Sequence, residues 1–330
     1  MIWYKDNNND IVISTRIRLA RNLDGVPFPN ALADKSVATE KIKAALGGGN
    51  SALAKDLDFI DLEKAEPEHK ARLAEEHLIS PQMLKGKGQS VYVSHDQTMS
   101  IMLMEEDHIR LQVIMAGNAL DKAYDLADKI DNVIEESVTY AFDEDFGYLT
   151  ACPTNAGTGM RASLMLHLPA LTLTKNINNV VASAGGMGIA VRGLYGEGTS
   201  AEGNFYQISN QVTMGVTERE IIEKLKTVTD RIIDMEQKAR EFLQKNSPAE
   251  LADKVYRSYG ILKYARKLSS SEAKALISDV MLGRGMGIIK EKGKILPMEC
   301  MILSAPSLIG GKLSADERDR KRAEFISSNI

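Results

Sequence analysis

Several features are scarce in this sequence of 330 residues, and each absence argues against a class of protein. Cysteine occurs only at positions 152 and 300, too few for a disulfide framework, so we expect reduced thiols and a cytoplasmic location. The opening "MIWYKDNNND" lacks the apolar core of a signal peptide, and no apolar run approaches the length that spans a bilayer. We therefore expect no membrane association.

A basic surface and a metal-ligand pattern are missing as well. The net charge of −4 argues against a protein that binds nucleic acid through its phosphates. Five histidines and two cysteines show no metal-ligand spacing, so we expect no metal site made by the protein. The apolar content of 44% and the charged content of 26% are typical of a globular chain, and the length allows two domains.

The order of apolar patterns predicts an α+β fold. Residues 36–80 are predicted mostly helical apart from "GGGN" at 47–50, and residues 90–116 form short β-type runs typical of an antiparallel meander. A helix is predicted from Asn118, a strand over 147–154, a helix over 159–171, and strands over 188–193 and 204–209. This mixture favours a largely antiparallel sheet flanked by helices.

A long helix is predicted from Thr217, which with Glu220 forms a capping-box pattern. The pattern "KNSP" at 245–248 ends it, and two further helices with serine caps follow. We predict a catalytic domain over 1–245 and a helical domain over 246–330. The long helix has a heptad stripe that predicts packing on a sheet or bundle, with a dimer seam as the alternative. The stripe comprises Ile221, Leu225, Val228, Ile232, Met235, Ala239 and Phe242.

The segment "CPTNAGTGMRAS" at 152–163 has the small residues of a phosphate-binding loop but not the lysine of a P-loop. Gly157 and Gly159 would let backbone N–H groups approach a phosphate closely. Arg161 is predicted just inside the following helix, where it would add charge to the positive end of the helix dipole.

Four more arginines have unusual surroundings. Alternation in an extended "ISTRIRLAR" places Arg16 and Arg18 on one face, Arg110 follows a carboxylate cluster, and Arg192 lies in a glycine-rich segment. Each taken alone is more typical of a solvated or salt-bridged side chain. If they converge with Arg161, the pocket suits a polyphosphate, because guanidinium groups match phosphate oxygens and phosphoryl transfer needs alignment and positive charge.

Carboxylates are gathered in the same region. Glu105, Glu106 and Asp107 are consecutive, and Glu197 lies in the glycine-rich segment. A polar turn is the plain interpretation, and a clamp for a cationic guanidinium acceptor is the functional one. The pKa of a guanidinium exceeds about 12, so it must lose a proton to attack phosphorus, and a nearby carboxylate could accept that proton.

Six segments resemble, in order, those of the ATP:guanido phosphotransferase family, which includes creatine and arginine kinases. They are "STRIRLAR", "EHLISP", "EEDHIR", "CPTNAGTGMRAS", "VRGLYGEGT" and "YQISN", from residue 14 to about 210. The resemblance implies ATP as the donor, with Mg²⁺ held mainly through ATP. It also implies a nucleotide site made by Ser14, Thr15, Arg16, Ile17, Arg18, His77, Arg110, Arg161, Ala162, Ser163, Leu164, Met165, Arg192, Gly193, Leu194, Tyr195, Gly196 and Glu197.

The resemblance further implies catalytic roles, in which Arg110, Arg161 and Arg192 act on the phosphates. Glu106 would be the principal base and orienting carboxylate, with Glu197 as its partner. Cys152 matches the reactive cysteine of the family, although a buried structural thiol fits the sequence equally well. The loop departs from the family pattern at positions 156 and 160, where neither change removes a polar group.

Two features of length favour one branch of the family. Only 13 residues precede Ser14, where the small-molecule kinases carry a sizeable helical domain, and about 120 residues follow "YQISN". Both features resemble the bacterial protein arginine kinases. That resemblance implies phosphorylation of arginine side chains in proteins, marking for a Clp-type ATPase and protease, an activator protein and a homodimer. The alternatives are a kinase of free arginine and a non-catalytic adaptor that binds phosphoarginine.

The segment "DERDRKRAEF" at 316–325 is, taken alone, typical of a solvated charged helix. The bacterial kinases that it resembles carry R-D-x-x-R-A as an allosteric phosphoarginine site, which here is Arg318, Asp319, Arg322 and Ala323. On a helix, Arg318 and Arg322 are four residues apart and share a face, so two guanidinium groups could bind one phosphorylated side chain.

Overall fold

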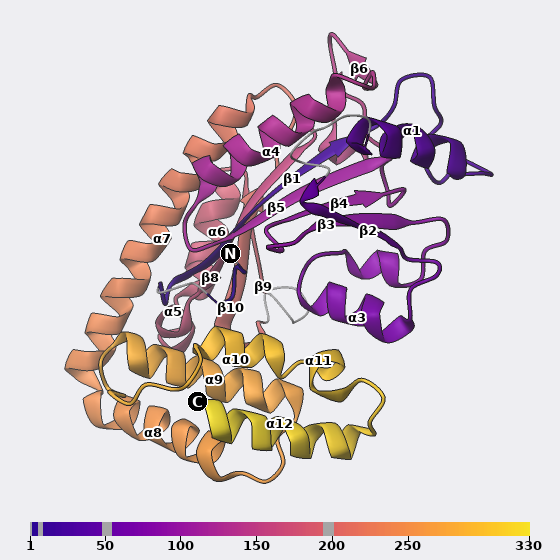
Figure 1. Ribbon diagram of the computed structural model, residues 1–330. Coiled ribbons are helices and arrows are strands. Elements are labelled where there is room, and N and C mark those ends of the chain that lie inside the picture. Colours follow the sequence, from indigo (N-terminus) through magenta and orange to yellow (C-terminus); the bar gives the residue numbers. More distant parts are fainter. Residues whose placement is uncertain (1, 6–8, 48–54, 194–200) are drawn as a thin grey trace. The chain divides into compact units, whose positions relative to one another are not determined.

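The computed structural model describes the chain except for residues 1, 6–8, 48–54 and 194–200 (Figure 1). Contacts between Cα atoms divide the chain into two compact units. The first unit comprises 1–3, 15–163 and 210–225, and the second comprises 4–14, 164–209 and 226–330. Three strands and one long helix run from one unit into the other, so each unit is built from several chain segments. The domain boundary at 245/246 stays a prediction.

Eight strands form one sheet in the order β2-β3-β4-β5-β1-β8-β10-β9. The strands β2, β3, β4 and β5 pair antiparallel in succession, so the α+β fold with its antiparallel meander is confirmed. A separate hairpin contains the short strands β6 (Phe142–Asp143) and β7 (Gly147–Tyr148). The sheet strands are β1 (Val12–Arg21), β2 (Leu57–Asp61), β3 (Ser90–Ser94), β4 (Met99–Leu103), β5 (Ile109–Ala116), β8 (Met160–His167), β9 (Ile189–Gly193) and β10 (Phe205–Asn210).

Helices belong to both units. The first unit contains α1 (Ser36–Gly47), α3 (Pro67–Glu75) and α4 (Leu120–Glu135), with 3-10 turns η1 (Pro81–Leu84) and η2 (Pro153–Asn155). The second contains α5 (Pro169–Leu173), α6 (Ile177–Gly186), η3 (Glu202–Asn204), α8 (Pro248–Tyr264), α9 (Ser270–Gly285), α10 (Pro297–Leu303), α11 (Pro306–Gly310) and α12 (Ala315–Asn329). The helix α7 (Glu218–Asn246) belongs to both. Within the residues described, no helix is long and apolar enough to cross a membrane.

The start of α7 follows from local sequence. The side chain of Thr217 accepts a hydrogen bond from the Glu220 N–H at 3.2 Å, and the Glu220 carboxylate accepts one from the Thr217 N–H at 2.7 Å, so the capping box is confirmed. Ser269 caps α9 by accepting a hydrogen bond from the Glu272 N–H at 3.2 Å, but Ser247 makes no capping bond, and the cap predicted there is wrong. In the heptad stripe only Met235 and Phe242 are exposed.

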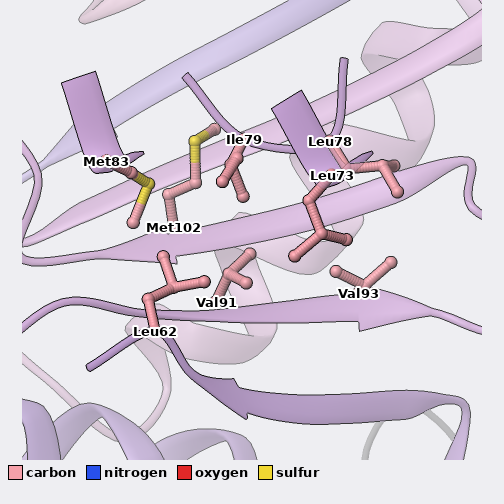
Figure 2. Packing of buried hydrophobic residues seen from close by; sticks show 8 residues of the cluster. All are labelled: Leu62, Leu73, Leu78, Ile79, Met83, Val91, Val93 and Met102. Carbon is pink, nitrogen blue, oxygen red and sulfur yellow. The ribbon is translucent and has the colours of Figure 1, made fainter. Parts of the chain in front are cut away.

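The core of the first unit fixes the segment that follows α3 (Figure 2). Leucine, isoleucine and methionine side chains of α3, of η1, and of the segments before α3 and between α3 and η1 pack on valines of β3 and a methionine of β4. Burying each such side chain contributes about 1.5–3 kcal/mol. Because the buried side chains flank residues 77–82, this packing holds that stretch against the sheet. The cluster comprises Leu62, Leu73, Leu78, Ile79, Met83, Val91, Val93 and Met102.

Three secondary-structure predictions are wrong. Residues 160–167 form the strand β8 instead of a helix, and seven of these eight residues are buried. A central strand with both faces covered gives a continuous apolar run, and Met, Leu and Ala there suggested a helix that tertiary pairing overrides. Residues 57–61 form the strand β2 within a stretch predicted helical, and the strand predicted over 147–154 is limited to Gly147–Tyr148.

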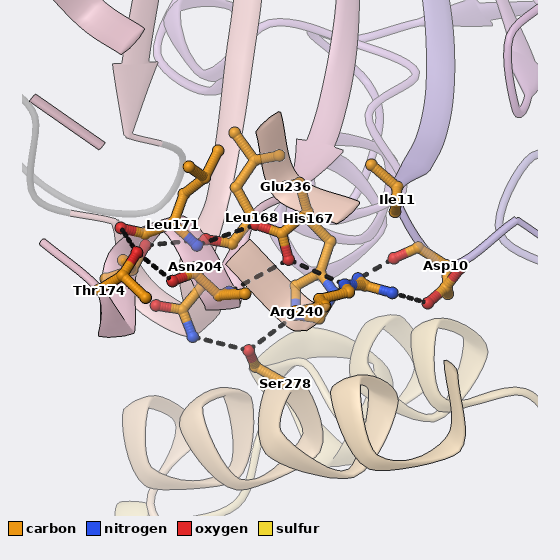
Figure 3. Close-up of polar contacts among 12 residues, drawn as sticks. Asp10, Ile11, His167, Leu168, Leu171, Thr174, Asn204, Glu236, Arg240 and Ser278 are labelled. Carbon is orange, nitrogen blue, oxygen red and sulfur yellow. Dashed lines mark hydrogen bonds and ion pairs between the residues drawn. The ribbon is translucent and has the colours of Figure 1, made fainter. Parts of the chain in front are cut away.

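A buried ion pair organises the second unit (Figure 3). The Glu236 carboxylate in α7 is fully buried and accepts hydrogen bonds from the N–H groups of Ala170 and Leu171, at 3.1 and 3.0 Å, at the start of α5. Arg240 donates to Glu236 at 2.9 Å and pairs with Asp10. Burial raises the pKa of Glu236, which the charge of Arg240 opposes. The pair thus ties α5 and the segment before β1 to α7.

A neutral histidine links β8 to α9 in the same unit. The His167 ring lies 2.8 Å from the Ser278 hydroxyl, which also accepts a hydrogen bond from the Asn204 amide at 2.9 Å. Burial, with a smaller contribution from Arg240, lowers the pKa of His167 to about 3. The ring is therefore uncharged at neutral pH and acts as a hydrogen-bonding spacer.

Arg322 anchors α12. Its side chain is 2% exposed and donates to the carbonyl oxygens of Ser304 at 2.9 Å and Leu268 at 2.8 Å, and to Asp319 at 2.6 Å. Arg318 is half-buried and donates to the Leu313 carbonyl at 2.6 Å. The donors of Arg322 therefore bind groups of the protein itself, whereas Arg318 is half-buried. Binding of phosphoarginine at this segment stays a prediction.

Replacing Arg322 by methionine should destabilise the protein by about 3 kcal/mol, because Asp319 and two carbonyl oxygens would lose their buried donor. Arg320→Met, two residues away in α12, is the control. Its side chain is 70% exposed and pairs with Asp316 at the surface, so the change should be within about 1 kcal/mol. Urea denaturation of both variants measures the difference, and equal stability would contradict the anchoring role.

Candidate active site

A pocket of about 230 Å³ lies in the first unit, where β1, the β4–β5 turn, η2 and the beginning of β8 meet. It brings together residues that the sequence scatters over more than a hundred positions. Polar and charged side chains predominate in its lining, as a site for a charged substrate requires. The lining residues are Arg18, Leu19, Ala20, Gln82, Glu106, Asp107, Arg110, Cys152, Thr154, Asn155, Gly159 and Arg161.

Four guanidinium groups lie near one another at this pocket. Burial lowers the pKa of Arg18 well below its usual value, and the positive charges of Arg16, Arg110 and Arg161 lower it further. The carboxylate of Glu105 opposes them. The Arg18 Nε is buried and has no hydrogen-bond partner among the described residues. Such clustered positive charge fits a polyanion, because several phosphate oxygens would relieve the repulsion.

Glu105 balances one of these arginines. It is 4% exposed and accepts hydrogen bonds from the Ser80 hydroxyl and from Arg110. Burial alone would raise the pKa of Glu105, but the charge of Arg110 and the bond from Ser80 outweigh it and hold that pKa below its usual value. Glu105 therefore stays ionised and orients Arg110.

Asp107 has a different task. It is 3% exposed, and its Oδ1 accepts hydrogen bonds from the Asn22 amide and the Ala151 N–H, both at 2.7 Å. Asn22 in turn accepts from the His108 N–H at 2.9 Å. The carboxylate thus ties the β4–β5 turn to the residue just before Cys152, and so sets the distance between the two sides of the pocket.

Glu106, between these two, is half-buried and lines the pocket. Burial raises the pKa of its carboxyl group, and the negative charges of Asp107 and Glu105 raise it further, against the opposing charge of Arg110. Of the three consecutive carboxylates, Glu106 is the one whose environment favours taking up a proton.

The two cysteines differ in their surroundings. Cys152 is half-buried and lines the pocket, with its Sγ 3.0 Å from the Thr154 hydroxyl. Cys300 is fully buried in the second unit, where burial raises its pKa to about 12 despite the charge of Arg284. Of the two interpretations left open by the sequence, the structure therefore favours an accessible thiol for Cys152.

The glycines of the 152–163 loop allow close packing of backbone. Gly157 has φ +100° and Gly159 has φ +63°. A Cβ on Gly157 would lie 2.2 Å from the Thr213 carbonyl oxygen, and one on Gly159 would lie 2.6 Å from the Ala20 carbonyl oxygen. Only glycine fits these positions, and Gly159 lines the pocket where it approaches β1.

His77 lies beside the arginines on a strained backbone, with φ 64°. Trp3 stacks on its ring with centroids 5.2 Å apart, and Gln112 donates to its carbonyl oxygen at 2.7 Å. Burial, with help from Arg16, lowers the pKa of His77 to about 3. The ring is therefore neutral at physiological pH, and non-glycine residues with positive φ are enriched at functional sites.

Several predicted nucleotide contacts are buried and are not among the pocket-lining residues. The Thr15 hydroxyl already donates to the Gly117 carbonyl at 2.7 Å and accepts from the Ala119 N–H at 2.9 Å. At these positions the side chains pack within the sheet, so the alternation that leaves Arg16 and Arg18 half-buried also buries their neighbours fully. The buried residues are Ser14, Thr15, Ile17, Ala162, Ser163, Leu164 and Met165.

The remaining predictions fall elsewhere. Arg161 lies in β8, so the predicted helix dipole beside it is wrong. Arg192 is exposed in β9 of the second unit, followed by Gly193, whereas Leu194, Tyr195, Gly196 and Glu197 lie outside the described residues. The sequence prediction missed Gln82, which lines the pocket directly after "EHLISP". Across the described ranges, no group of three His, Cys, Asp or Glu residues could hold a metal ion.

Comparisons with known proteins agree with this geometry. The family model of the ATP:guanido phosphotransferase C-terminal catalytic domain matches residues 38–239, and that of the protein-arginine kinase McsB C-terminal domain matches 248–330. A protein-arginine kinase of Halothermothrix orenii is 47% identical over 97% of this chain and 93% of its own. One of Caldanaerobacter subterraneus subsp. tengcongensis is 44% identical over 98% of both.

Solved structures show the same fold. A lombricine kinase has a TM-score of 0.61 and 26% identity over 70% of this chain and 68% of its own. The duplicated taurocyamine kinase of Schistosoma mansoni, with bound transition-state-analogue components, has a TM-score of 0.63 and 27% identity over 70% of this chain and 34% of its own. Relatives above 40% identity along nearly the whole chain, and a family model matching most of it, establish that this protein belongs to the ATP:guanido phosphotransferase family.

Proposed function

We propose that this protein is an ATP-dependent kinase that transfers the γ-phosphoryl group to arginine side chains of proteins. The observation that carries the proposal is the pocket in which Arg18, Arg110 and Arg161 converge beside Glu106, a carboxylate whose pKa is raised. The cationic part suits the triphosphate, and the carboxylate suits a guanidinium acceptor. The relatives named protein-arginine kinase, which match nearly the whole chain, support a protein acceptor over free arginine.

ATP would be held through its phosphates. Arg16, Arg18, Arg110 and Arg161 would neutralise the phosphate oxygens, and Mg²⁺ would enter bound to ATP. The neutral ring of His77, supported by Trp3, would lie against the nucleotide. Arg192, Gly193 and residues 194–197 would complete the nucleotide site. Several positive charges would then neutralise the transferring group, as phosphoryl transfer requires.

The proposed transfer step depends on where the carboxylate of Glu106 lies relative to the arginines that would bind the phosphates. Glu106 would accept hydrogen bonds from the acceptor guanidinium and place one nitrogen in line with the γ-phosphorus. As the N–P bond forms, the bond between the γ-phosphorus and the β–γ bridging oxygen breaks, and ADP leaves. The nitrogen loses its proton to Glu106, with Glu197 as second carboxylate. Cys152, which also lines the pocket, would help to hold the guanidinium.

The wider setting belongs to the same proposal. Residues 1–245 would form the catalytic domain and 246–330 a helical domain that makes a homodimer, supported by the exposed apolar side chains of Tyr256, Ile261 and Tyr264 on α8. Arg318, Asp319, Arg322 and Ala323 would sense phosphoarginine, an activator protein would assist, and modified proteins would pass to a Clp-type protease. With ATP as the donor and a reduced Cys152, the reaction would take place in the cytoplasm.

Mass spectrometry under conditions that preserve acid-labile phosphate tests the function directly. The full chain, incubated with Mg–ATP and a basic protein, should produce phosphoarginine on that protein. Free arginine in a parallel reaction should be a far poorer acceptor. Efficient transfer to free arginine alone would favour a small-molecule kinase, and phosphoarginine binding without any transfer would favour an adaptor.

Glu106→Gln should reduce kcat/KM for transfer by about 100-fold or more, because the acceptor would lose its base. ATP affinity, measured by isothermal titration, should stay nearly unchanged. Since the pKa of Glu106 is raised in the folded state, its ionisation opposes folding above that pKa, so the variant should unfold at a higher temperature at pH 7. Glu136→Gln, an exposed change in the same unit, should alter neither property. Equal loss of ATP binding and transfer would contradict the assigned role.

The pH profile offers a separate test. With the pKa of Glu106 raised, kcat/KM should fall as the pH drops through a value above the usual range of glutamate. Asp107→Asn removes a negative neighbour while keeping the Oδ1 acceptor for Asn22 and Ala151, so the acid limb should move to lower pH. Asp128→Asn, exposed on α4, should leave the limb in place. An unmoved limb in Asp107→Asn would count against Glu106 as the base.

A further inference from the structure

A second pocket, of about 370 Å³, lies in the first unit beside the loop that carries Cys152. Its walls are the β6–β7 hairpin, residues 157–158 of the loop, and residues 214–220, which lead into α7. Figure 1 shows β6 in a hairpin that projects from the sheet. We call this the hairpin pocket; the chemistry proposed above does not use it.

Large apolar side chains are exposed around the hairpin pocket. Phe142 is 58% exposed, Phe146 is 54% exposed and Met214 is 43% exposed, and all three line it. Single exposed apolar residues are ordinary, but several on one concave surface are typical of a binding site. The Phe142 ring packs against the Tyr148 ring in an edge-to-face arrangement, with centroids 5.2 Å apart. The hairpin therefore presents aromatic surface on a rigid base.

The charge of the hairpin pocket is entirely negative. Its ionisable lining residues are Asp145, Glu218 and Glu220, and its lining contains no lysine, arginine or histidine. Glu220 is engaged in the cap of α7 with Thr217. The side chains of Asp145 and Glu218 make no ion pair or hydrogen bond within the described part of the chain. Two unengaged carboxylates beside exposed aromatic rings complement a cationic partner with an apolar stem.

The chain itself shows that this hairpin accommodates a guanidinium. The Arg21 guanidinium carbon lies 3.6 Å from the centroid of the Tyr148 ring, on the buried side of the hairpin. Arg21 also pairs with Asp131 at 2.7 Å. An aromatic ring and a carboxylate thus hold one arginine from inside, and the hairpin pocket offers the same two kinds of group on its outer side.

The hairpin pocket and the arginine pocket share one loop. Gly157 and Thr158 line the hairpin pocket, whereas Cys152, Asn155 and Gly159 line the arginine pocket. Adjacent positions of one backbone are about 3.8 Å apart, so a ligand chain would need to span only a few residues to reach both pockets. An extended peptide with its target arginine beside Glu106 could therefore place another side chain against the hairpin.

We propose that the hairpin pocket binds a lysine or arginine of the protein substrate that lies roughly two to four residues from the phosphorylated arginine. The inference rests on the proposed function and specifies which acceptors it favours. Asp145 and Glu218 attract the flanking cation, while Phe142 and Phe146 contact its aliphatic stem. The enzyme thereby prefers arginines within basic segments. This preference comes from the local charge of the hairpin pocket, since the net charge of the chain is only −4.

Two synthetic peptides test the inference with the full-length protein. Both contain one arginine in a Gly/Ser background. In one peptide, lysine occupies the second, third and fourth positions on each side of the arginine. In the other, glutamine occupies the same positions. Phosphoarginine formation should give a kcat/KM about five-fold higher for the lysine peptide, and the ratio should fall towards one in 0.5 M salt, which screens exposed charges.

Charge-removing variants locate the preference. Asp145→Asn/Glu218→Gln should bring the ratio between the two peptides close to one. Asp128→Asn/Glu136→Gln removes the same number of exposed carboxylates from α4 and its C-cap, outside the hairpin pocket, and should keep the five-fold ratio. Phe146→Ser should lower the ratio as well, since it removes the ring but no charge.

The outcomes separate this inference from the function on which it rests. Equal kcat/KM for both peptides in the unmodified protein, or equal loss of preference in the two charge variants, would overturn the hairpin pocket alone. No phosphoarginine on either peptide or on a basic protein would overturn the proposed function, and this inference with it. A five-fold ratio that only the hairpin variants abolish supports both.

Discussion

Mutual repulsion among guanidinium groups is the constraint around which the first unit is arranged. Beyond the effect of burial, the charges of Arg16, Arg110 and Arg161 lower the pKa of Arg18, and the carboxylate of Glu105 opposes them. Like charges at short range separate unless the surrounding structure holds them. Here the neighbouring strands β5, β1 and β8 supply all four and hold them in place. The fold thus holds these positive charges close together against their repulsion. A bound polyanion would remove that repulsion, so its binding would also stabilise the fold.

Three consecutive carboxylates differ in role because their surroundings differ. Glu105 forms an ion pair with Arg110. Asp107 accepts hydrogen bonds from the Asn22 amide and the Ala151 N–H. In the part of the chain that the structure describes, Glu106 has neither arrangement, and its pKa is raised. The first two hold the walls of the pocket in place. They also raise the proton affinity of the third, since their negative charges face it. A structural role for two acids therefore creates the chemical role of their neighbour.

The sequence predicted best what is decided locally. Capping residues at Thr217 and alternation around Arg16 and Arg18 depend on nearby positions, and both appear in the structure. The strand β8 was mistaken for a helix because a strand buried on both faces has no polar alternation. The burial of Arg322 was missed because its partners, the carbonyl groups of Leu268 and Ser304, are distant in sequence. For the same reason, spacing alone did not distinguish Glu105 from Glu106, and only the family resemblance singled out Glu106.

An enzyme that phosphorylates arginine carries arginines in its own chain that could also be phosphorylated. Arg21, Arg240 and Arg322 are at most 8% exposed, and each fixes part of the fold through ion pairs or hydrogen bonds to carbonyl groups. A phosphoryl group on any of them would replace a buried cation with an anion and break these bonds. Burial therefore protects these arginines from phosphorylation by the enzyme itself. Only arginines on its surface are accessible to the active site of a second molecule.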